Sequence, residues 1–159
     1  MRALLACVLL VVAGCLLGAP LAGAAAPAHG PLTVGQAHHA YLAAQRTADE
    51  AKRVYVATRA YSARYGGAVG RWCRTARVAG WGWGALPTLM GVTYYESRGD
   101  PTVVNSLGCT GLLQIYASVW HCAIAWLMVP LNNLREGLHI WKGEGRRFLP
   151  AWAGDPAVP

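Results

Sequence analysis

The chain has 159 residues, a formal net charge of +7, 55% hydrophobic residues and 13% charged residues. This length allows one compact domain and a short additional element. Much of the apolar content lies in the first 28 positions, so the composition does not indicate a membrane-embedded body. The sequence contains no internal repeat, no low-complexity tract and no series of strand-like segments, which excludes repeat and all-β architectures.

Residues 1–26 have the features of a secretory signal peptide. Arg2 supplies a positive start, an apolar stretch follows over residues 3–17, and small residues surround the expected cleavage region near Ala24. We therefore expect an exported product. Two alternatives stay open. The uncharged stretch is long enough to span a bilayer, and Val12-Ala13-Gly14-Cys15 resembles a lipoprotein box that would place a lipid anchor at Cys15.

A long basic helix is predicted over residues 36–66, after a tether rich in Pro, Gly and Ala at residues 27–35. No Gly or Pro interrupts residues 36–65, and Gly66-Gly67 then ends the helix. The apolar positions that recur at helical spacing are Tyr41, Ala44, Ala48, Ala51 and Tyr55. This amphipathic pattern predicts a packing or spacer element. A coiled-coil arm is disfavoured because alanine is a weak core residue.

Seven basic residues follow one another without an intervening acid. They are Lys52, Arg53, Arg59, Arg64, Arg71, Arg74 and Arg77. Such a stripe attracts polyanions, through an electrostatic force that salt weakens. No base-reading motif accompanies it, so nucleic acid is not an expected partner.

Three further helices are predicted, over residues 69–78, 86–96 and 131–142. Pro87 lies in the first turn of the second of these helices, where its missing N–H costs nothing. Asp100-Pro101 predicts a turn after that helix, and Gly143 ends the last one. Residues 117–127 are compatible with either a helix or irregular structure.

Three cysteines remain after removal of a leader that contains Cys7 and Cys15: Cys73, Cys109 and Cys122. An oxidising exterior favours a disulfide and leaves one thiol over. A bridge between Cys109 and Cys122 would close a loop of modest length, and Cys73 with Cys109 is the alternative pair. No Cys/His spacing resembles a zinc site, so we expect no metal and no cofactor.

An apolar run over residues 89–95 ends on Glu96, the only acidic residue between Lys52 and Arg98. A carboxyl group at the inner end of an apolar helix is poorly solvated, which favours its neutral form and raises its pKa. Glycosidases use such a carboxyl as a general acid near neutral pH. Glu96 is therefore the candidate catalytic residue. The Gly-rich segment that follows contains Gln114, whose amide offers a donor and an acceptor.

The residues around Glu96 resemble the signature of the soluble lytic transglycosylase and goose-type lysozyme-like domains. The matching residues are Glu96-Ser97-Arg98-Gly99-Asp100-Pro101, Asn105, Gly108-Cys109, Gly111-Leu112-Leu113-Gln114-Ile115 and residues 130–138. The resemblance covers residues 70–153 and leaves a tail at residues 154–159. The Tyr-Asn-Ala-Gly element of larger members has no counterpart here, because residues 143–152 contain no Tyr. The resemblance implies a mainly α, small lysozyme-like domain of the α+β lysozyme superfamily, preceded by the long helix.

The resemblance also implies a secreted, cell-wall-associated enzyme that cleaves the β-1,4 bond between N-acetylmuramic acid and N-acetylglucosamine in peptidoglycan. Glu96 would be the single acid/base, and Ser97 would hold it. The implied substrate-binding residues are Asn105, Gly111, Gln114, Ile115, Tyr116 and Asn133. The expected partners are glycan strands and anionic wall polymers, bound by a monomer. A hydrolytic muramidase and a non-catalytic wall-glycan-binding protein are the alternatives.

Overall fold

The computed structural model describes residues 32–148 and residue 152. The predicted leader, the candidate anchor Cys15 and the tail at residues 154–159 lie outside the described residues. The chain divides into two compact units, residues 1–41 and residues 42–159, which are described separately. The second unit includes residues 42–65 of the long helix.

In the first unit, residues 34–41 form the beginning of α2, which spans Val34–Tyr65, and residues 32 and 33 precede it. Thr33 and Gln36 form a reciprocal cap. The Thr33 N–H donates to Gln36 Oε1 at 2.9 Å, and the Gln36 N–H donates to Thr33 Oγ1 at 3.3 Å. This capping box starts the helix inside the predicted tether.

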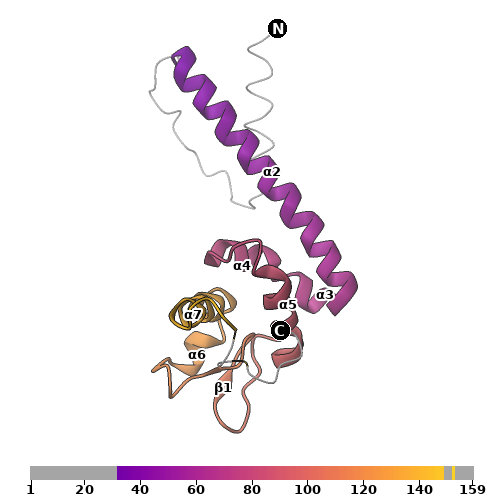
Figure 1. Cartoon of the computed structure of the whole chain (residues 1–159), viewed down its shortest axis with the longest axis vertical. Helices are drawn as coiled ribbons and strands as arrows, with labels where there is room; N and C mark the ends of the chain where they lie inside the picture. Colours follow the sequence, from indigo (N-terminus) through magenta and orange to yellow (C-terminus); the bar gives the residue numbers. More distant parts are fainter. Residues whose placement is uncertain (1–31, 149–151, 153–159) are drawn as a thin grey trace, which may run out of the picture. The chain divides into compact units, whose positions relative to one another are not determined.

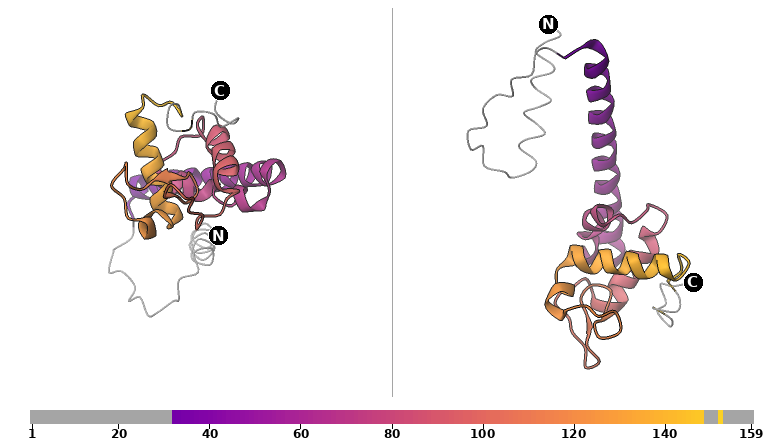
Figure 2. Two further views of the ribbon diagram at one scale, coloured as in Figure 1. Left: turned by 90° about the horizontal axis from the view of Figure 1, so that it is seen from below. Right: turned by 90° about the vertical axis from the view of Figure 1, so that its left-hand side faces the viewer.

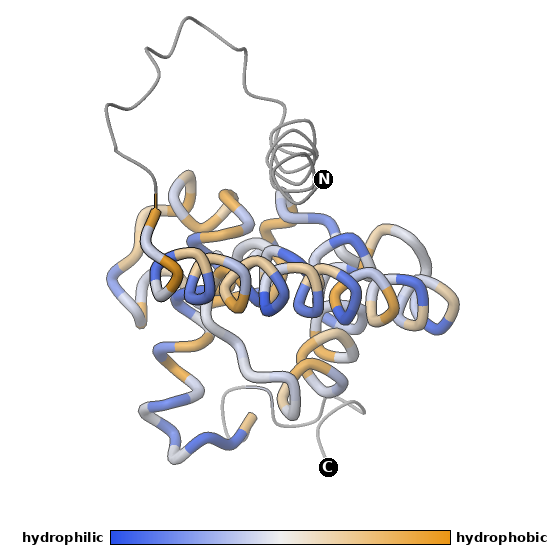
Figure 3. The backbone as a smooth tube through the Cα atoms, turned by 90° about the horizontal axis from the view of Figure 1, so that it is seen from above, coloured by the Kyte–Doolittle hydropathy of each residue, from blue (hydrophilic) through white to orange (hydrophobic). Residues whose placement is uncertain are grey.

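In the second unit, the buried face of α2 is not the one that the apolar positions of the sequence predicted. Tyr55 is 61% exposed, and Ala44, Ala48 and Ala51 are also exposed. The half-buried positions are instead Leu42, Glu50, Val54, Ala57, Thr58, Tyr61, Ser62 and Tyr65. The predicted face is wrong because the true contact is partly polar, and a stripe chosen by apolar residues alone misses it. Figure 3 shows hydrophilic and hydrophobic positions alternating along α2.

Two short helices replace the single helix predicted over residues 69–78. They are α3, Gly67–Gly70, and α4, Cys73–Ala79. Gly70 lies so close to α2 that a Cβ atom there would collide with the side chain and backbone of Ser62. This close crossing turns the chain at residues 71–72, and a regular helix cannot continue through it.

The remaining elements contribute to one hydrophobic core. Figures 1 and 2 show their course. They are α5 (Leu86–Ser97), β1 (Cys109–Thr110), β2 (Ile115–Tyr116), α6 (Ile124–Leu127) and α7 (Pro130–Gly143). The antiparallel pair β1–β2 was not predicted, since two-residue strands leave no alternating pattern. α7 packs against α4 and α6. The described part of the chain is thus mainly α-helical.

Aromatic rings fill the centre of this core. Trp81 is fully buried, donates its indole N–H to the Leu134 carbonyl at 2.8 Å, and stacks on Phe148 at a centroid distance of 5.7 Å. Trp152 donates to the Leu113 carbonyl at 2.9 Å. Both indoles therefore fill volume and satisfy a backbone group that would otherwise be buried without a partner. None of the described helices combines the length and apolar character that a membrane crossing requires.

The polar part of the α2 contact is centred on Glu50. Its Oε1 accepts from Arg77 Nε at 2.7 Å and its Oε2 accepts from Trp83 Nε1 at 3.2 Å. The hydrogen bond from Arg77 is the largest cause that holds the pKa of the Glu50 carboxyl below its ordinary value of 4.5. A lowered folded-state pKa stabilises the fold above the unfolded-state value and ceases to do so as pH falls through the folded-state value.

Replacing Glu50 with Gln should therefore make the melting temperature depend less strongly on pH under acidic conditions. The parent should have the higher melting temperature at pH 7, and the difference should shrink below pH 4.5 as the parent carboxyl takes up its proton. Thermal unfolding followed by circular dichroism between pH 7 and pH 3 measures this. Asp49→Asn, at the adjacent exposed position, is the control, and it should retain the parent's pH dependence. Parallel curves for parent and E50Q would contradict the assignment.

Candidate active site

The carboxyl-terminal end of α5 carries Glu96, which is half-buried. The helix ends because Arg98 adopts a left-handed conformation, with φ 55°. Ser97 is 5% exposed, and its Oγ lies 3.1 Å from the Thr93 carbonyl oxygen and 3.0 Å from that of Leu112. The same Oγ accepts from the Gly99 N–H at 3.2 Å. Ser97 thus fastens the helix end next to Glu96 onto the β1–β2 turn.

Gln114 lies in that turn, two residues after Leu112. It is half-buried and has a left-handed backbone, with φ 46°. Its Nε2 donates to the carbonyls of Val103 and Gly111, each at 3.1 Å. Both amide protons are therefore used to hold the loop, and the side chain offers a ligand its Oε1 acceptor. A sugar hydroxyl or amide N–H is the group that such an acceptor would bind.

Asn133 of α7 is fully buried beneath the turn. Its Oδ1 accepts from the Leu113 N–H at 2.9 Å, and its Nδ2 donates to the carbonyls of Thr110 at 2.9 Å and Leu127 at 3.1 Å. One side chain thus joins three segments. Asn133 is a positioning residue for the turn and does not reach the surface, which corrects its prediction as a substrate-binding residue.

Two other predicted binding residues also belong to the interior. Ile115 is 3% exposed and forms part of the core. Gly111 is buried with φ 78°, and a Cβ atom there would lie 2.6 Å from the Leu127 carbonyl oxygen. Only glycine allows that approach without strain. Ile115 and Gly111 were predicted to contact the ligand, but both pack in the interior, because this side of the β1–β2 turn lies against the core.

Asn105 and Tyr116 remain at the surface. The Oδ1 of Asn105 accepts from the backbone N–H groups of Leu107 at 2.9 Å and Cys109 at 3.0 Å, so this residue orders the loop before β1. Tyr116 is 41% exposed on β2, opposite Cys109 in the strand pairing. Among the predicted substrate-contacting residues and the candidate acid, those with a side chain that a ligand can reach are thus Glu96, Asn105, Gln114 and Tyr116.

Asp100 is the other carboxylate close to Glu96 in the chain. It accepts from the Thr102 N–H at 2.8 Å and from the Thr102 hydroxyl at 2.7 Å. The backbone bond first, and the hydroxyl bond second, hold the pKa of Asp100 below its ordinary value. Asp100 is therefore an ionised turn residue, which makes it a poor proton donor. The described residues contain no group of three or more His, Cys, Asp or Glu side chains that could bind a metal ion.

The predicted disulfide is absent from the structure. Cys73, Cys109 and Cys122 are all free. Burial raises the pKa of the Cys73 thiol, which lies inside the core and bonds Thr58 of α2. Cys122 directs its Sγ to the Trp120 carbonyl at 3.3 Å. Each of these two thiols thus has a local partner of its own, and this corrects the expectation of a Cys109–Cys122 bridge.

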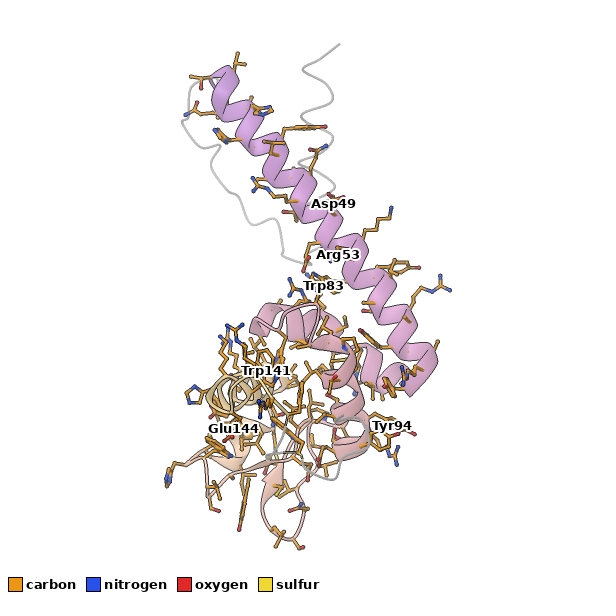
Figure 4. The ribbon with its side chains drawn as sticks, in the orientation of Figure 1. Asp49, Arg53, Trp83, Tyr94, Trp141 and Glu144 are labelled. Carbon is orange, nitrogen blue, oxygen red and sulfur yellow. The ribbon has the colours of Figure 1, made fainter. Side chains whose placement is uncertain are left out.

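Aromatic and cationic side chains adjacent to Glu96 were not predicted as part of the site. Arg98 Cζ lies 4.1 Å from the ring centroid of Tyr94 and 6.0 Å from that of Tyr95. Tyr95 is 44% exposed, and Tyr94 is labelled in Figure 4. The sequence Tyr-Tyr-Glu-Ser-Arg could have indicated these residues as candidates, since an aromatic ring and a guanidinium beside an acid can both contact a sugar.

Comparison with protein-family models, with curated proteins and with solved structures found no match to this chain.

Proposed function

We propose that the chain is a peptidoglycan-cleaving lytic transglycosylase with a small lysozyme-like domain and Glu96 as its single acid/base. The observation that carries the proposal is the attachment of Ser97 to Leu112. It brings the helix end with Glu96 against the turn that presents Gln114. This attachment supports the proposal, because it links the neighbour of Glu96 to the turn that carries Gln114, and the two residues belong to separate motifs.

A single carboxylate is enough for this reaction. Glu96 donates its proton to the glycosidic oxygen between N-acetylmuramic acid and N-acetylglucosamine, and the bond from C1 to that oxygen breaks. The Glu96 carboxylate then takes the proton of the muramyl 6-hydroxyl, whose oxygen bonds to C1. The product is a 1,6-anhydro ring, and Glu96 regains the proton it gave. No second catalytic carboxylate is required, in contrast to two-carboxylate glycosidases.

The hydrogen bonds that hold Asp100 in its turn support the single-acid scheme. The two bonds from Thr102 commit this carboxylate to the turn. In a two-carboxylate glycosidase the second acid lies across the scissile bond and acts on water or on C1. Asp100 is occupied in its own turn and does not supply that second group.

Mass spectrometry of muropeptides released from purified peptidoglycan tests the proposal. Anhydromuramyl ends are the expected result. Reducing ends alone would identify a muramidase, in which water attacks C1 in place of the 6-hydroxyl. No soluble product from an intact, folded protein would contradict an enzymatic function and favour the wall-glycan-binding alternative.

A further inference from the structure

A shallow hollow lies on the surface of the second unit, away from Glu96. It has a volume of about 340 Å³ and is lined by Lys52, Arg53, Val56, Ala57 and Trp83. This volume is in the range of small-molecule sites. Trp83 precedes α5 and Glu96 is near its other end, so about 15 Å of helix separates the hollow from the candidate acid. The hollow is therefore a second location with its own chemistry.

Arg53 is held in place at the hollow by an aromatic ring. Its Cζ lies 4.7 Å from the Trp83 ring centroid, and Figure 4 shows the two side chains close together beside α2. Trp83 is itself fixed by the bond from its Nε1 to Glu50 Oε2 at 3.2 Å. A guanidinium carries several N–H donors in a planar fork that can form two parallel bonds to an oxyanion.

Within the described residues, the N–H donors of Arg53 make no hydrogen bond, in contrast to those of Arg77. Arg77 also lies 4.7 Å from the Trp83 ring centroid, but it donates to Glu50 and to the Trp81 carbonyl. Among residues 32–148 and residue 152, the only ion pair is that of Arg77 with Glu50, and no hydrogen bond from Arg53 is present. A fixed guanidinium with unused donors is preorganised for an external anion.

The local charge is positive. Lys52 is exposed next to Arg53. The Glu50 carboxylate is paired with Arg77, whose hydrogen bond is the largest cause of its lowered pKa, and Arg53 contributes less to that lowering. Asp49 precedes Arg53 by one turn on α2, and it is the other acid of this segment. Val56 and Ala57 add an apolar wall. Two cations beside an apolar wall match an anion whose carbon chain continues away from the charge.

We propose that this hollow binds the phosphodiester group of a polyol-phosphate polymer. Arg53 would donate two parallel N–H bonds to the phosphate oxygens, Lys52 would add a point charge, and the polyol carbons would lie against Val56. A tetrahedral phosphodiester fits the guanidinium fork. The site is separate from Glu96, and it stands whether or not Glu96 cleaves glycan.

Titration calorimetry of the full chain with poly(glycerol phosphate) at about 0.15 M salt tests this inference. Arg53→Gln should weaken binding about tenfold, as expected for loss of charge-assisted hydrogen bonds. Arg53→Lys, which keeps the charge and loses the fork, should weaken it several-fold. Arg59→Gln is the matched control, because Arg59 is an exposed arginine of the same helix outside the hollow. It should bind within about twofold of the parent.

Two results would overturn the inference. Equal losses for R53Q and R59Q would show that the whole basic helix attracts polyanions without a defined site. Equal affinity for an oligonucleotide of matched charge would show that the polyol chain is not recognised. Glu96→Gln should leave this binding unchanged, so failure of the binding experiment and failure of the cleavage experiment are distinguishable.

Discussion

Replacing Glu96 with Gln should reduce release of soluble muropeptides by about 10²–10⁴-fold. The substitution keeps the size and shape of the side chain and removes only the proton that the mechanism transfers. The loss should lie at the upper end of this range if the same group serves first as acid and then as base. Initial rates of release from purified peptidoglycan measure the effect, and circular dichroism checks that the fold is kept.

Asp100→Asn is the matched control for this substitution. It makes the same acid-to-amide change four residues away, and the amide oxygen can still accept the bonds from Thr102. Its rate should stay within a few-fold of the parent rate. A rate for E96Q close to that of the parent would exclude Glu96 as the general acid. Equal large losses in both variants would point to a shared structural effect.

Replacing Asn133 with Ala should cost about 3–5 kcal/mol of folding free energy. The substitution leaves the Leu113 N–H and the Leu127 carbonyl buried without the partner that Asn133 supplies, and it opens a cavity under the turn. Each buried polar group without a partner costs about 1–3 kcal/mol. Urea unfolding measures the change, and the melting temperature should fall by roughly 10 °C or more.

Asn132→Ala is the control on the same helix. Asn132 is half-buried and makes one hydrogen bond, from its Nδ2 to the Trp126 carbonyl at 3.3 Å. Its loss should cost about 1 kcal/mol or less. Similar costs for the two variants would contradict the assignment of Asn133 as the residue that joins the turn, α6 and α7.

Local signals in the sequence were sufficient to predict the main helices and their approximate ends. The absence of Gly and Pro from residues 36–65 predicted the long helix, and Pro87 and Pro130 each lie in the first turn of a helix. The helix start was missed by two residues because the Thr33–Gln36 capping box was overlooked. The pair β1–β2 could not be predicted, since its strands are too short for a periodic pattern.

The sequence by itself determined the mainly helical architecture, and it led to the proposal of Glu96 and Gln114 as site residues through the residue types around them. The tertiary structure decided which of the other candidates reach the surface. Gly111, Ile115 and Asn133 share a motif region with Gln114, but they face the core. The physical reason is that burial depends on partners distant in the chain. Asn133 meets Leu113 across 20 residues, and Arg77 meets Glu50 across 27. No local pattern records such contacts, which form only when the helices pack.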